Sequence, residues 1–359
     1  MRITFVVPAF ESSGGARIVA GHAQMLADKG HEVLIVGPEP RSPGLRERTK
    51  ALLGRATLPA ALEQSHYARA QVPLHVIGHG GPLELDDVPD ADIIIATFWI
   101  TAEWIAALPR KKGAKVHFIQ HYEDFPGVPL DRLEAVWRLP TYKIAIAQWL
   151  VDLGRERFGI DKIALVPNSI DHDIFKPRDR GKEGPLTVGF LFSRASFKDV
   201  PTSIRALQRL KEFEPRVTIL SFGAVRPEAR QMPPWCEFQQ LPTQHEIANI
   251  YSRCHAWLST SETEGFNLPP LEAMATGCPA VCSKTGRPLE IIENGTNGYL
   301  VDQGDSDGFA KALSKILSLS DEAWRRMSTA AIEAVAHPTW EESSKLFEEA
   351  LTESVAASV

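Results

Sequence analysis

The stretch that decides the fold of this chain is SETEGFNLPPLEAMATGCPAV, residues 261–281. The preceding segment Ala256–Ser259 is apolar and predicts a buried strand. One of the two adjacent prolines suits the first turn of a helix, because a proline there sacrifices no hydrogen bond. The helix continues over Leu271–Thr276, and Gly277 is typical of its end. The stretch therefore predicts a strand, a loop and a helix in succession.

The loop of this unit predicts an anion site. Its last residues, Gly265, Phe266, Asn267 and Leu268, bring backbone N–H groups to the start of the helix. Unpaired N–H groups and the helix dipole favour a phosphate at that position. Gly265 carries no side chain, so a ligand can approach the backbone closely.

Two acids frame the loop, Glu264 and Glu272, with seven residues between them. Glu272 lies about one turn into the predicted helix, where its carboxylate can accept two hydroxyl hydrogen bonds from a ribose. Glu264 precedes the loop and would face the group attached to the phosphate. The other interpretation is a solvated acid and an ordinary acid near a helix N-terminus. Together the acids and amides favour a nucleotide-sugar as the ligand.

Outward from this stretch, short apolar segments alternate with amphipathic ones. Such segments, separated by helices, predict parallel sheets covered on both faces. The predicted helices include 16–29 and 148–158. The predicted strands are Ile3–Val7, Val33–Val36, Ile93–Ala96, Val116–Ile119, Ile144–Ala147, Ile163–Val166, Thr187–Leu191, Val217–Ser221, Ala256–Ser259 and Pro279–Val281.

The pattern pauses at Pro167–Pro185, which is rich in Pro, Gly, Asp and Lys and predicts a linker. The sequence therefore predicts an α/β protein with two doubly wound, Rossmann-like domains in series. Ligands of open α/β sheets bind at the carboxyl ends of the strands. A cleft between the two domains is the expected site.

Composition narrows the function classes. Hydrophobic residues make up 44% of the 359 residues, and the net charge of -6 argues against nucleic acid as a partner. The N-terminal MRITFVVPAF predicts a first strand rather than a secretory signal, and no segment approaches the roughly 20 apolar residues of a membrane span. We expect a cytoplasmic protein with four reduced thiols, at Cys236, Cys254, Cys278 and Cys282.

The E-x7-E pattern within EGFNLPPLEAMATGCPAV resembles the hallmark of the family 4, group 1 glycosyltransferases of the two-domain GT-B fold. LSTSETEGF before it, RPLEIIENGTNGYLV at Arg287–Val301 and VPNSIDHDIFKP at Val166–Pro177 fit the same family. The resemblance implies retaining transfer of a hexosyl or deoxyhexosyl group from a nucleotide-diphosphate sugar to a hydroxyl acceptor, without a metal or other cofactor. Attack on the front face, with the leaving phosphate taking the acceptor's proton, needs no protein nucleophile.

The resemblance also implies a domain plan and a biological setting. Residues 1–176 would form the acceptor-side domain, residues 177–337 would bind the nucleotide-sugar, and a C-terminal helix within 338–359 would return to the first domain. The acceptor would be a glycan or lipid-linked glycan, in the synthesis of bacterial surface polysaccharides or glycoconjugates.

Three residues of the first domain are further candidates for the site. Gly14 and Gly15 follow the first strand and allow close approach of a diphosphate or an acceptor, although an ordinary strand-to-helix turn would look the same. His121, in HFIQHYEDF, resembles the family's histidine that contacts the transferred sugar; the alternative is a loop histidine bonded to backbone. Glu123 and Asp124 are nearby acids that would position the acceptor.

Arg194 and Lys198, in FLFSRASFKD, would stabilise the diphosphate leaving group, as an arginine and a lysine do in this family. This chain has three residues between them where the family commonly has five, which weakens the assignment of Lys198 more than that of Arg194. The alternative is a surface pair at a helix start. The segment 241–243 is expected to line the nucleobase pocket. The Asp-x-Asp strings at 171–173 and 305–307 are assigned to the linker and a helix start, and not to a metal.

Two basic clusters of the first domain admit two interpretations. They are solvated loops, or they bind an anionic membrane surface or a lipid-diphosphate acceptor at the inner face of the membrane. The clusters are Arg41, Arg46, Arg48, Lys50 and Arg55, within the long connection 38–72, and Arg110, Lys111, Lys112 and Lys115.

Other functions fit less well. A nucleotide-sugar epimerase of the same fold would need an acid/base set, and none is evident. A non-catalytic two-domain sugar-binding protein would have no use for Arg194 opposite a phosphate-binding helix. An NAD-dependent oxidoreductase lacks its G-x-G-x-x-G fingerprint. The sugar, the base and the acceptor are not specified by the sequence.

Overall fold

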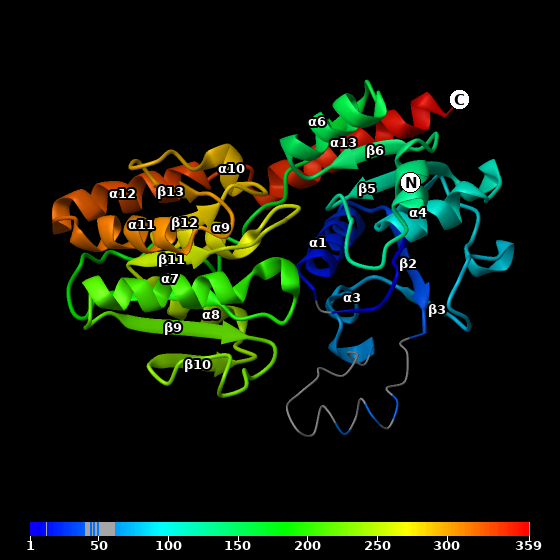
Figure 1. Ribbon diagram of the computed structural model, residues 1–359. Coiled ribbons are helices and arrows are strands. Elements are labelled where there is room, and N and C mark those ends of the chain that lie inside the picture. The colour runs from blue at the N-terminus through cyan, green and yellow to red at the C-terminus, as the bar shows by residue number, and fades with distance from the viewer. Residues whose placement is uncertain (12, 40–43, 45, 47–48, 50–61, 359) are drawn as a thin grey trace. The chain divides into compact units, whose positions relative to one another are not determined.

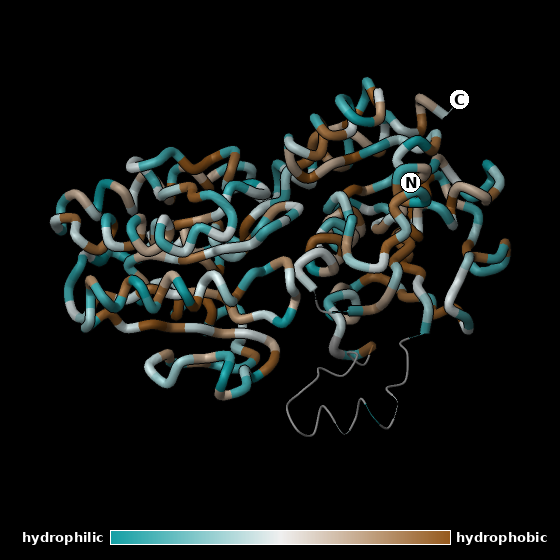
Figure 2. Tube along the Cα trace, viewed as in Figure 1, coloured by the Kyte–Doolittle hydropathy of each residue, from teal (hydrophilic) through white to brown (hydrophobic). Residues whose placement is uncertain are grey.

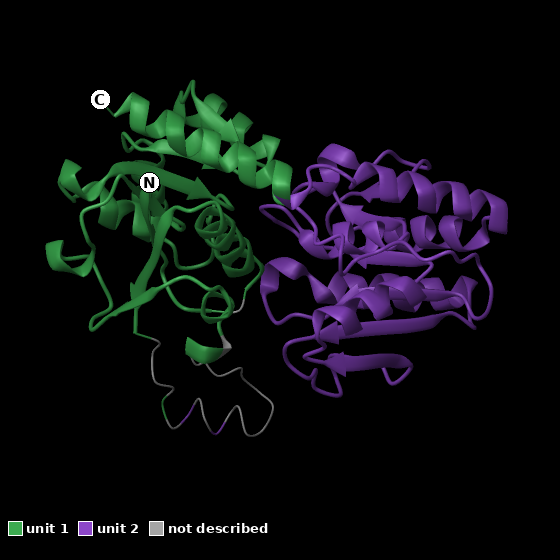
Figure 3. Cartoon of the chain, turned by 180° about the vertical axis from the view of Figure 1, so that it is seen from behind, with its two compact units in different colours: residues 1–44, 58–168, 341–359 green, residues 45–57, 169–340 purple. Residues whose placement is uncertain are grey.

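The helices and strands of the computed structural model group into two units (Figure 3). The structure describes residues 1–359 apart from 12, 40–43, 45, 47–48, 50–61 and 359. Unit 1 comprises residues 1–44, 58–168 and 341–359, and unit 2 comprises residues 45–57 and 169–340. Between Leu165 and Thr187, within the predicted linker, the chain forms no helix or strand.

In its described residues, unit 1 holds a seven-stranded sheet in the order β3-β2-β1-β4-β5-β6-β7 (Figure 1). Each neighbouring pair is parallel. The topology reverses at β1, which lies between β2 and β4, and ligands of such sheets bind beside that point. The strands are β1 (Arg2–Val6), β2 (Glu32–Pro38), β3 (Leu74–Ile77), β4 (Ile93–Ala96), β5 (Ala114–Ile119), β6 (Tyr142–Ala145) and β7 (Ile163–Leu165).

Helices cover both faces of this sheet. One face carries α1 (Gly14–Asp28), and the other carries α4 (Trp99–Ala106), α5 (Leu130–Trp137) and α6 (Gln148–Phe158). The short α3 (His66–Arg69) packs on α1. Buried aliphatic residues of the strands fill the space between sheet and helices.

The last helix, α13 (Trp340–Ala357), packs on the α1 face of unit 1. Phe347 is fully buried, and its ring lies 4.3 Å from that of His22 on α1 and 4.9 Å from that of Phe118 on β5. Glu348 adds ion pairs with Lys29 at 2.7 Å and His31 at 3.0 Å. Residues from the end of the chain therefore complete the core of unit 1.

The described part of unit 2 holds a six-stranded sheet in the order β10-β9-β8-β11-β12-β13. All of its neighbouring pairs are parallel. The reversal falls between β8 and β11, which are hydrogen-bonded neighbours far apart in sequence. The strands are β8 (Thr187–Leu191), β9 (Thr218–Gly223), β10 (Cys236–Gln240), β11 (Ala256–Ser259), β12 (Ala280–Ser283) and β13 (Gly298–Val301).

Two helical layers enclose this second sheet. The helices α7 (Val200–Phe213) and α11 (Ser306–Ser318) pack together on one face. On the other lie α8 (Gln244–Arg253), α9 (Leu268–Ala275) and α12 (Asp321–Ala334), and α10 (Pro288–Ile291) follows β12. The fully buried Phe190, Leu258 and Phe309 join the sheet to the α7–α11 layer.

The predicted α/β fold with two doubly wound parallel sheets is confirmed. Figure 2 shows brown, hydrophobic segments inside each unit, as expected for buried strands. No bounds were predicted for β3, β10 and β13. All three are edge strands: β3 is interrupted by His75, β10 is largely polar, and β13 is only four residues long. None of the described helices is long and apolar enough to cross a membrane.

Candidate active site

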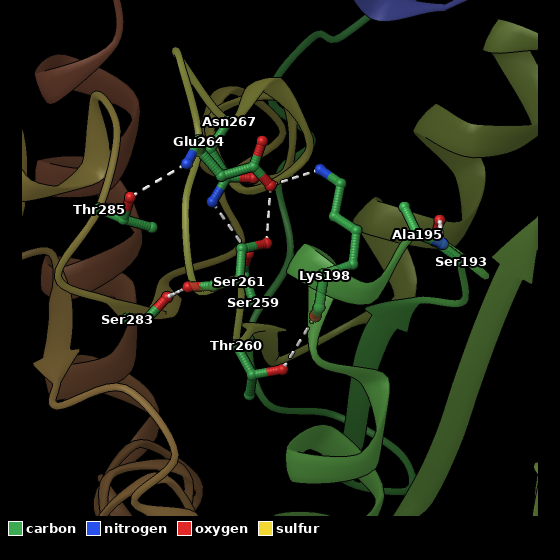
Figure 4. Close-up of polar contacts among 10 residues, drawn as sticks. All are labelled: Ser193, Ala195, Lys198, Ser259, Thr260, Ser261, Glu264, Asn267, Ser283 and Thr285. Atoms are coloured by element: carbon green, nitrogen blue, oxygen red, sulfur yellow. Dashed lines mark hydrogen bonds and ion pairs between the residues drawn. The ribbon is translucent and has the colours of Figure 1, made fainter. Parts of the chain in front are cut away.

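The loop after β11 places the carboxylate of Glu264 in a polar cluster of unit 2 (Figure 4). Glu264 is 7% exposed, and its Oε1 contacts the Nζ of Lys198 and accepts a 2.7 Å hydrogen bond from the Ser261 hydroxyl. A buried carboxylate is stable only when it is paired and hydrogen-bonded in this way. The first predicted acid therefore lies beside a cation at the carboxyl edge of the sheet.

Lys198 reaches Glu264 because β8 and β11 are neighbours in the sheet. The lysine ends a short 3₁₀ turn, Ser196–Lys198, that follows β8. Hydrogen bonds join this turn and the residue after it to the β11 loop: Glu262 N donates to the Phe197 carbonyl at 2.7 Å, and the Thr260 hydroxyl lies 2.9 Å from the Asp199 carbonyl and 3.4 Å from that of Lys198. The pair is thus built from two loops whose relative position is fixed by backbone contacts.

Asn267 ends the loop and begins α9. Its φ of +67° lies in the left-handed region, which asparagine tolerates better than most residues. Its side-chain amide donates to Ser259 Oγ at 3.0 Å, which holds this turn against the end of β11. The predicted strand, loop and helix are all present, and α9 starts at Leu268.

The amides at the start of α9 are available to an anion. Phe266, Asn267 and Leu268 are all under 9% exposed, and their backbone N–H groups donate to no other group within the described residues. Pro269 and Pro270 carry no N–H, so they leave Leu268 as the donor that begins the first turn. Buried amides without partners are uncommon in proteins, and an anionic ligand satisfies them.

A second loop, after β12, is hydrogen-bonded to the loop after β11. The Thr285 hydroxyl accepts from the Glu264 N–H at 3.1 Å, and Arg287 N donates to the Phe266 carbonyl at 3.0 Å. Gly286 has a φ of +63°, and a Cβ there would lie only 3.0 Å from the Phe266 carbonyl oxygen. Glycine is therefore required for the two loops to meet.

Glu272, the second predicted acid, points from α9 into the interior of unit 2. It is 5% exposed, and the Tyr251 hydroxyl of α8 donates to its Oε2 at 3.2 Å. A carboxylate has about four acceptor positions, and the bond from Tyr251 occupies one of them and orients the group. The structure thus places a held acceptor within the helix that follows the anion site.

Arg194, the other predicted cation, lies on the segment that follows β8. It is half-buried in the segment between β8 and the 3₁₀ turn, and its Nη2 donates to the Arg226 carbonyl at 3.4 Å. A small cavity of about 10 Å³ lies at the ends of β8 and β11, lined by Lys198, Ser261 and Asn267 among others. That volume holds one water at most.

Gly14 and Gly15 are the first two residues of α1. Ser13 caps the helix by accepting from Ala16 N at 3.1 Å. A Cβ at Gly15 would lie 3.4 Å from the side-chain oxygen of Gln120, which is close to an ordinary van der Waals contact. This oxygen of Gln120 is buried and has no hydrogen-bond partner among the described residues.

His121 lies in the loop after β5, next to Gln120. Its Nδ1 accepts from the backbone N–H of Glu123 at 2.8 Å. Its ring stacks on Phe125, with centroids 4.8 Å apart and planes at 22°, and meets Trp149 of α6 edge-on at 6.2 Å. The imidazole is therefore bonded to backbone, as the alternative interpretation expected, and it is also held by two aromatic rings.

The two acids after His121 differ sharply. Asp124 is exposed, whereas Glu123 is 3% exposed and accepts from Trp99 N at 2.7 Å. Burial raises the pKa of Glu123 well above its ordinary value, against the opposing effect of that hydrogen bond. The Glu123 side chain is therefore not exposed on the surface of unit 1, where an acceptor would contact it.

The other sequence features have local structural contacts. Of the first basic cluster only Arg46 falls within the described residues, while Arg41, Arg48, Lys50 and Arg55 lie outside them. In the second cluster, Lys112 donates to the Val88 carbonyl and Lys115 to that of Ala106. Arg110 and Lys111 are exposed. The Asp-x-Asp strings form turns: Asp171 accepts from Asp173 N, and Asp305 caps α11.

Sequence reasoning missed the residues that hold the candidates in place. Ser261 lies inside the decisive stretch and could have been found there. Tyr251 and Thr285 contact Glu272 and Glu264 across the fold, and Gln120 lies near Gly15; no local spacing indicates these pairs.

Two family models match consecutive stretches of the chain, which together span residues 12–334. The model for Glycosyltransferase Family 4 matches residues 12–174, and the model for Glycosyl transferases group 1 matches residues 175–334. The D-inositol 3-phosphate glycosyltransferase of Stackebrandtia nassauensis is 26% identical over 227 residues, which are 56% of this chain and 51% of the relative. The N-acetyl-alpha-D-glucosaminyl L-malate synthase of Bacillus anthracis is 36% identical over 95 residues, 26% of this chain and 25% of that protein. The alignments thus span about half, or less, of these curated relatives.

Solved structures agree in fold over almost the whole length. HepE of Anabaena, crystallised with UDP-glucose, has a TM-score of 0.76 at 18% identity and covers 98% of this chain and 100% of its own. The sucrose-phosphate synthase of Thermosynechococcus elongatus has a TM-score of 0.73 at 16% identity, with 99% and 100% covered. With the paired acids on one loop and helix, and with both sheets of GT-B type, the chain belongs to the group 1, family 4 glycosyltransferases.

Proposed function

We propose that this protein is a retaining glycosyltransferase that moves a sugar from a nucleoside-diphosphate sugar to a hydroxyl acceptor. One observation carries the proposal: the buried Glu264, paired with Lys198, precedes the start of α9, where the backbone N–H groups of Phe266, Asn267 and Leu268 have no partner within the described residues. Backbone amides at that position can bind a phosphate. The carboxylate and the ammonium of the pair can stabilise the charges that develop when the bond between sugar and phosphate breaks.

The donor would lie on unit 2. Its β-phosphate would accept from the amides of Phe266, Asn267 and Leu268, and its ribose would donate to Glu272, which Tyr251 orients. HepE of Anabaena was crystallised with UDP and with UDP-glucose, which makes these compounds the first donors to try. The proposal commits to a nucleoside diphosphate and leaves the sugar to the test.

Breaking the bond between sugar and phosphate leaves positive charge on the sugar and negative charge on the phosphate. A carboxylate at Glu264 would stabilise the first, and the ammonium of Lys198 the second, with Arg194 as a further cation of the same loop. The leaving phosphate would take the acceptor's proton, so no protein nucleophile and no metal is needed. Fixed charges in a buried site act more strongly than the same charges in water.

The acceptor would bind over unit 1, near Gly14, Gly15 and His121. A glycan or a lipid-linked glycan offers the hydroxyl, and the assembly of surface polysaccharide or glycoconjugates is the setting we propose. The exposed Arg110 and Lys111 would add attraction to an anionic lipid surface, so the enzyme would work in the cytoplasm at the inner face of the membrane.

A two-stage experiment tests the proposal. Thermal shift with a panel of nucleoside-diphosphate sugars identifies the donor, because a ligand that binds only the folded state raises Tm. Proton NMR of the product made with that donor then reports the anomeric configuration. Transfer with retention supports the proposal. Inversion, donor isomerisation without an acceptor, or binding without turnover would each replace it with another function.

A further inference from the structure

The loop after β5 in unit 1 contains an acid that the proposed reaction does not use. Glu123 has a φ of +71°, in the left-handed region that costs a non-glycine residue about 1 kcal/mol or more. Its side chain is almost fully buried. Backbone strain is unfavourable, and so is a buried acid that has no cationic partner among the described residues, so their joint presence in one residue needs an explanation.

The two ends of Glu123 perform two connected tasks. Its carboxyl accepts from Trp99 N at 2.7 Å, which fastens the β5 loop to the first turn of α4. Its backbone N–H donates to His121 Nδ1 at 2.8 Å. The positive φ turns the chain so that both contacts are made at once.

These contacts determine the form of His121. A ring nitrogen that accepts from an amide carries no hydrogen, so in the neutral imidazole the hydrogen is on Nε2. Phe125 and Trp149 fix the plane of the same ring. His121 is thereby held as a hydrogen-bond donor through Nε2, which suits the oxygen of a sugar hydroxyl and does not suit a general base.

We propose that Glu123 is a positioning residue that holds His121 in its Nε2–H form and orientation through the Trp99 anchor and the strained turn. This inference rests on the proposed function for its effect on transfer, but the tautomer itself is a property of the free protein. Glu123 is itself 3% exposed, so it would act on a substrate only through His121.

The tautomer is measured by ¹⁵N NMR of the histidine-labelled full chain, with the His121 signal assigned by loss in His121→Gln. We expect the nitrogen shifts of an unprotonated Nδ1 and a protonated Nε2, unchanged in Glu123→Gln, whose amide oxygen can still accept from Trp99 N. In Glu123→Ala we expect a mixture of both tautomers. An Nδ1–H form in the unaltered protein, or no change in Glu123→Ala, would overturn the proposal whether or not the protein transfers sugar.

A double-mutant cycle separates positioning from general damage to the fold. Displacing a substrate-contacting group typically costs up to roughly 100-fold in rate, so Glu123→Ala should lower kcat by about 10- to 100-fold. In a His121→Ala background the same change should cost little more, because its effect acts through the imidazole. Independent, multiplying losses would contradict the proposal, and equal melting temperatures of the variants serve as the control. Failure of the unaltered protein to transfer any sugar would instead count against the proposed function.

Discussion

In each unit, a loop that follows a parallel strand contains a buried glutamate, and the partners of the two glutamates differ. Glu264 of unit 2 contacts a lysine and a serine hydroxyl. Glu123 of unit 1 accepts one backbone N–H, and burial raises its pKa. A carboxylate beside a cation can respond to charge in a bound substrate, whereas a carboxyl without one is favoured in its neutral form. Burial alone therefore does not identify a reactive acid. The groups that contact the carboxyl, such as a cation, indicate whether it is reactive.

The sharpest test of this contrast removes the acid of unit 2. Glu264→Ala should lower kcat by roughly 100- to 1,000-fold, because it deletes a fixed charge beside the reacting sugar. Donor affinity should change much less. Steady-state kinetics at saturating donor measure the effect. Glu262→Ala is the matched control, because Glu262 is an exposed glutamate two positions earlier in the same loop; an equal loss in that variant, or none in Glu264→Ala, would remove the assignment.

The second acid of unit 2 should act on binding rather than on turnover. Hydrogen bonds to charged groups contribute about 1.5–3 kcal/mol each, so Glu272→Ala should raise the Kd of the nucleotide by roughly 10- to 100-fold. Tyr251→Phe removes only the group that orients Glu272 and should have a smaller effect in the same direction. Isothermal titration calorimetry with UDP checks both variants. Undiminished affinity in Glu272→Ala would show that the ribose is held elsewhere.

Acid should weaken unit 1 through its buried neutral histidines. Burial lowers the pKa of His22 and of His117 from 6.5 to about 3. Between those values the unfolded chain binds protons that the folded chain does not. Stability therefore falls as pH drops from about 6.5 towards 3, at up to about 1.4 kcal/mol per pH unit for each histidine. Urea unfolding at a series of pH values measures the slope, which His22→Phe should flatten; an unchanged slope in that variant would be contrary to expectation.

The smallest expected effect concerns Glu123 and stability. Its folded-state pKa is raised, so its contribution is full below the ordinary value of 4.5 and is lost as pH rises through the folded value. Glu123→Gln keeps the shape without the titration and should be more stable than the unaltered protein at neutral pH. Each kcal/mol gained raises Tm by roughly 2–4 °C. Scanning calorimetry should show the gap widening above pH 4.5, and a gap that narrows instead would refute a neutral Glu123.

The central strands and the strand–loop–helix around Glu264 were predictable because they carry continuous local signals. Strands such as Ile93–Ala96 are buried on both faces and read as unbroken apolar runs. The edge strand Leu74–Ile77 is partly exposed and contains His75, so its pattern resembles that of a loop. A strand is therefore easier to predict from sequence when both of its faces are buried than when it is partly exposed.

The partners of the site residues were not predictable in the same way. Lys198 meets Glu264 only because β8 and β11 become neighbours in the sheet, and Tyr251 meets Glu272 across two helices. The positive φ of Glu123 follows from its long-range anchor to Trp99. Spacing along the chain indicates which acids matter, but their charge state and orientation arise from tertiary contacts.

The most direct test of the central claim is a crystal structure of the protein with UDP or with the donor found by thermal shift. We expect the β-phosphate within hydrogen-bond distance of the amides of Phe266–Leu268, the ribose hydroxyls on Glu272, and the sugar or its place beside Glu264. A diphosphate bound away from the start of α9, with Glu272 still making no contact to the nucleotide, would contradict it.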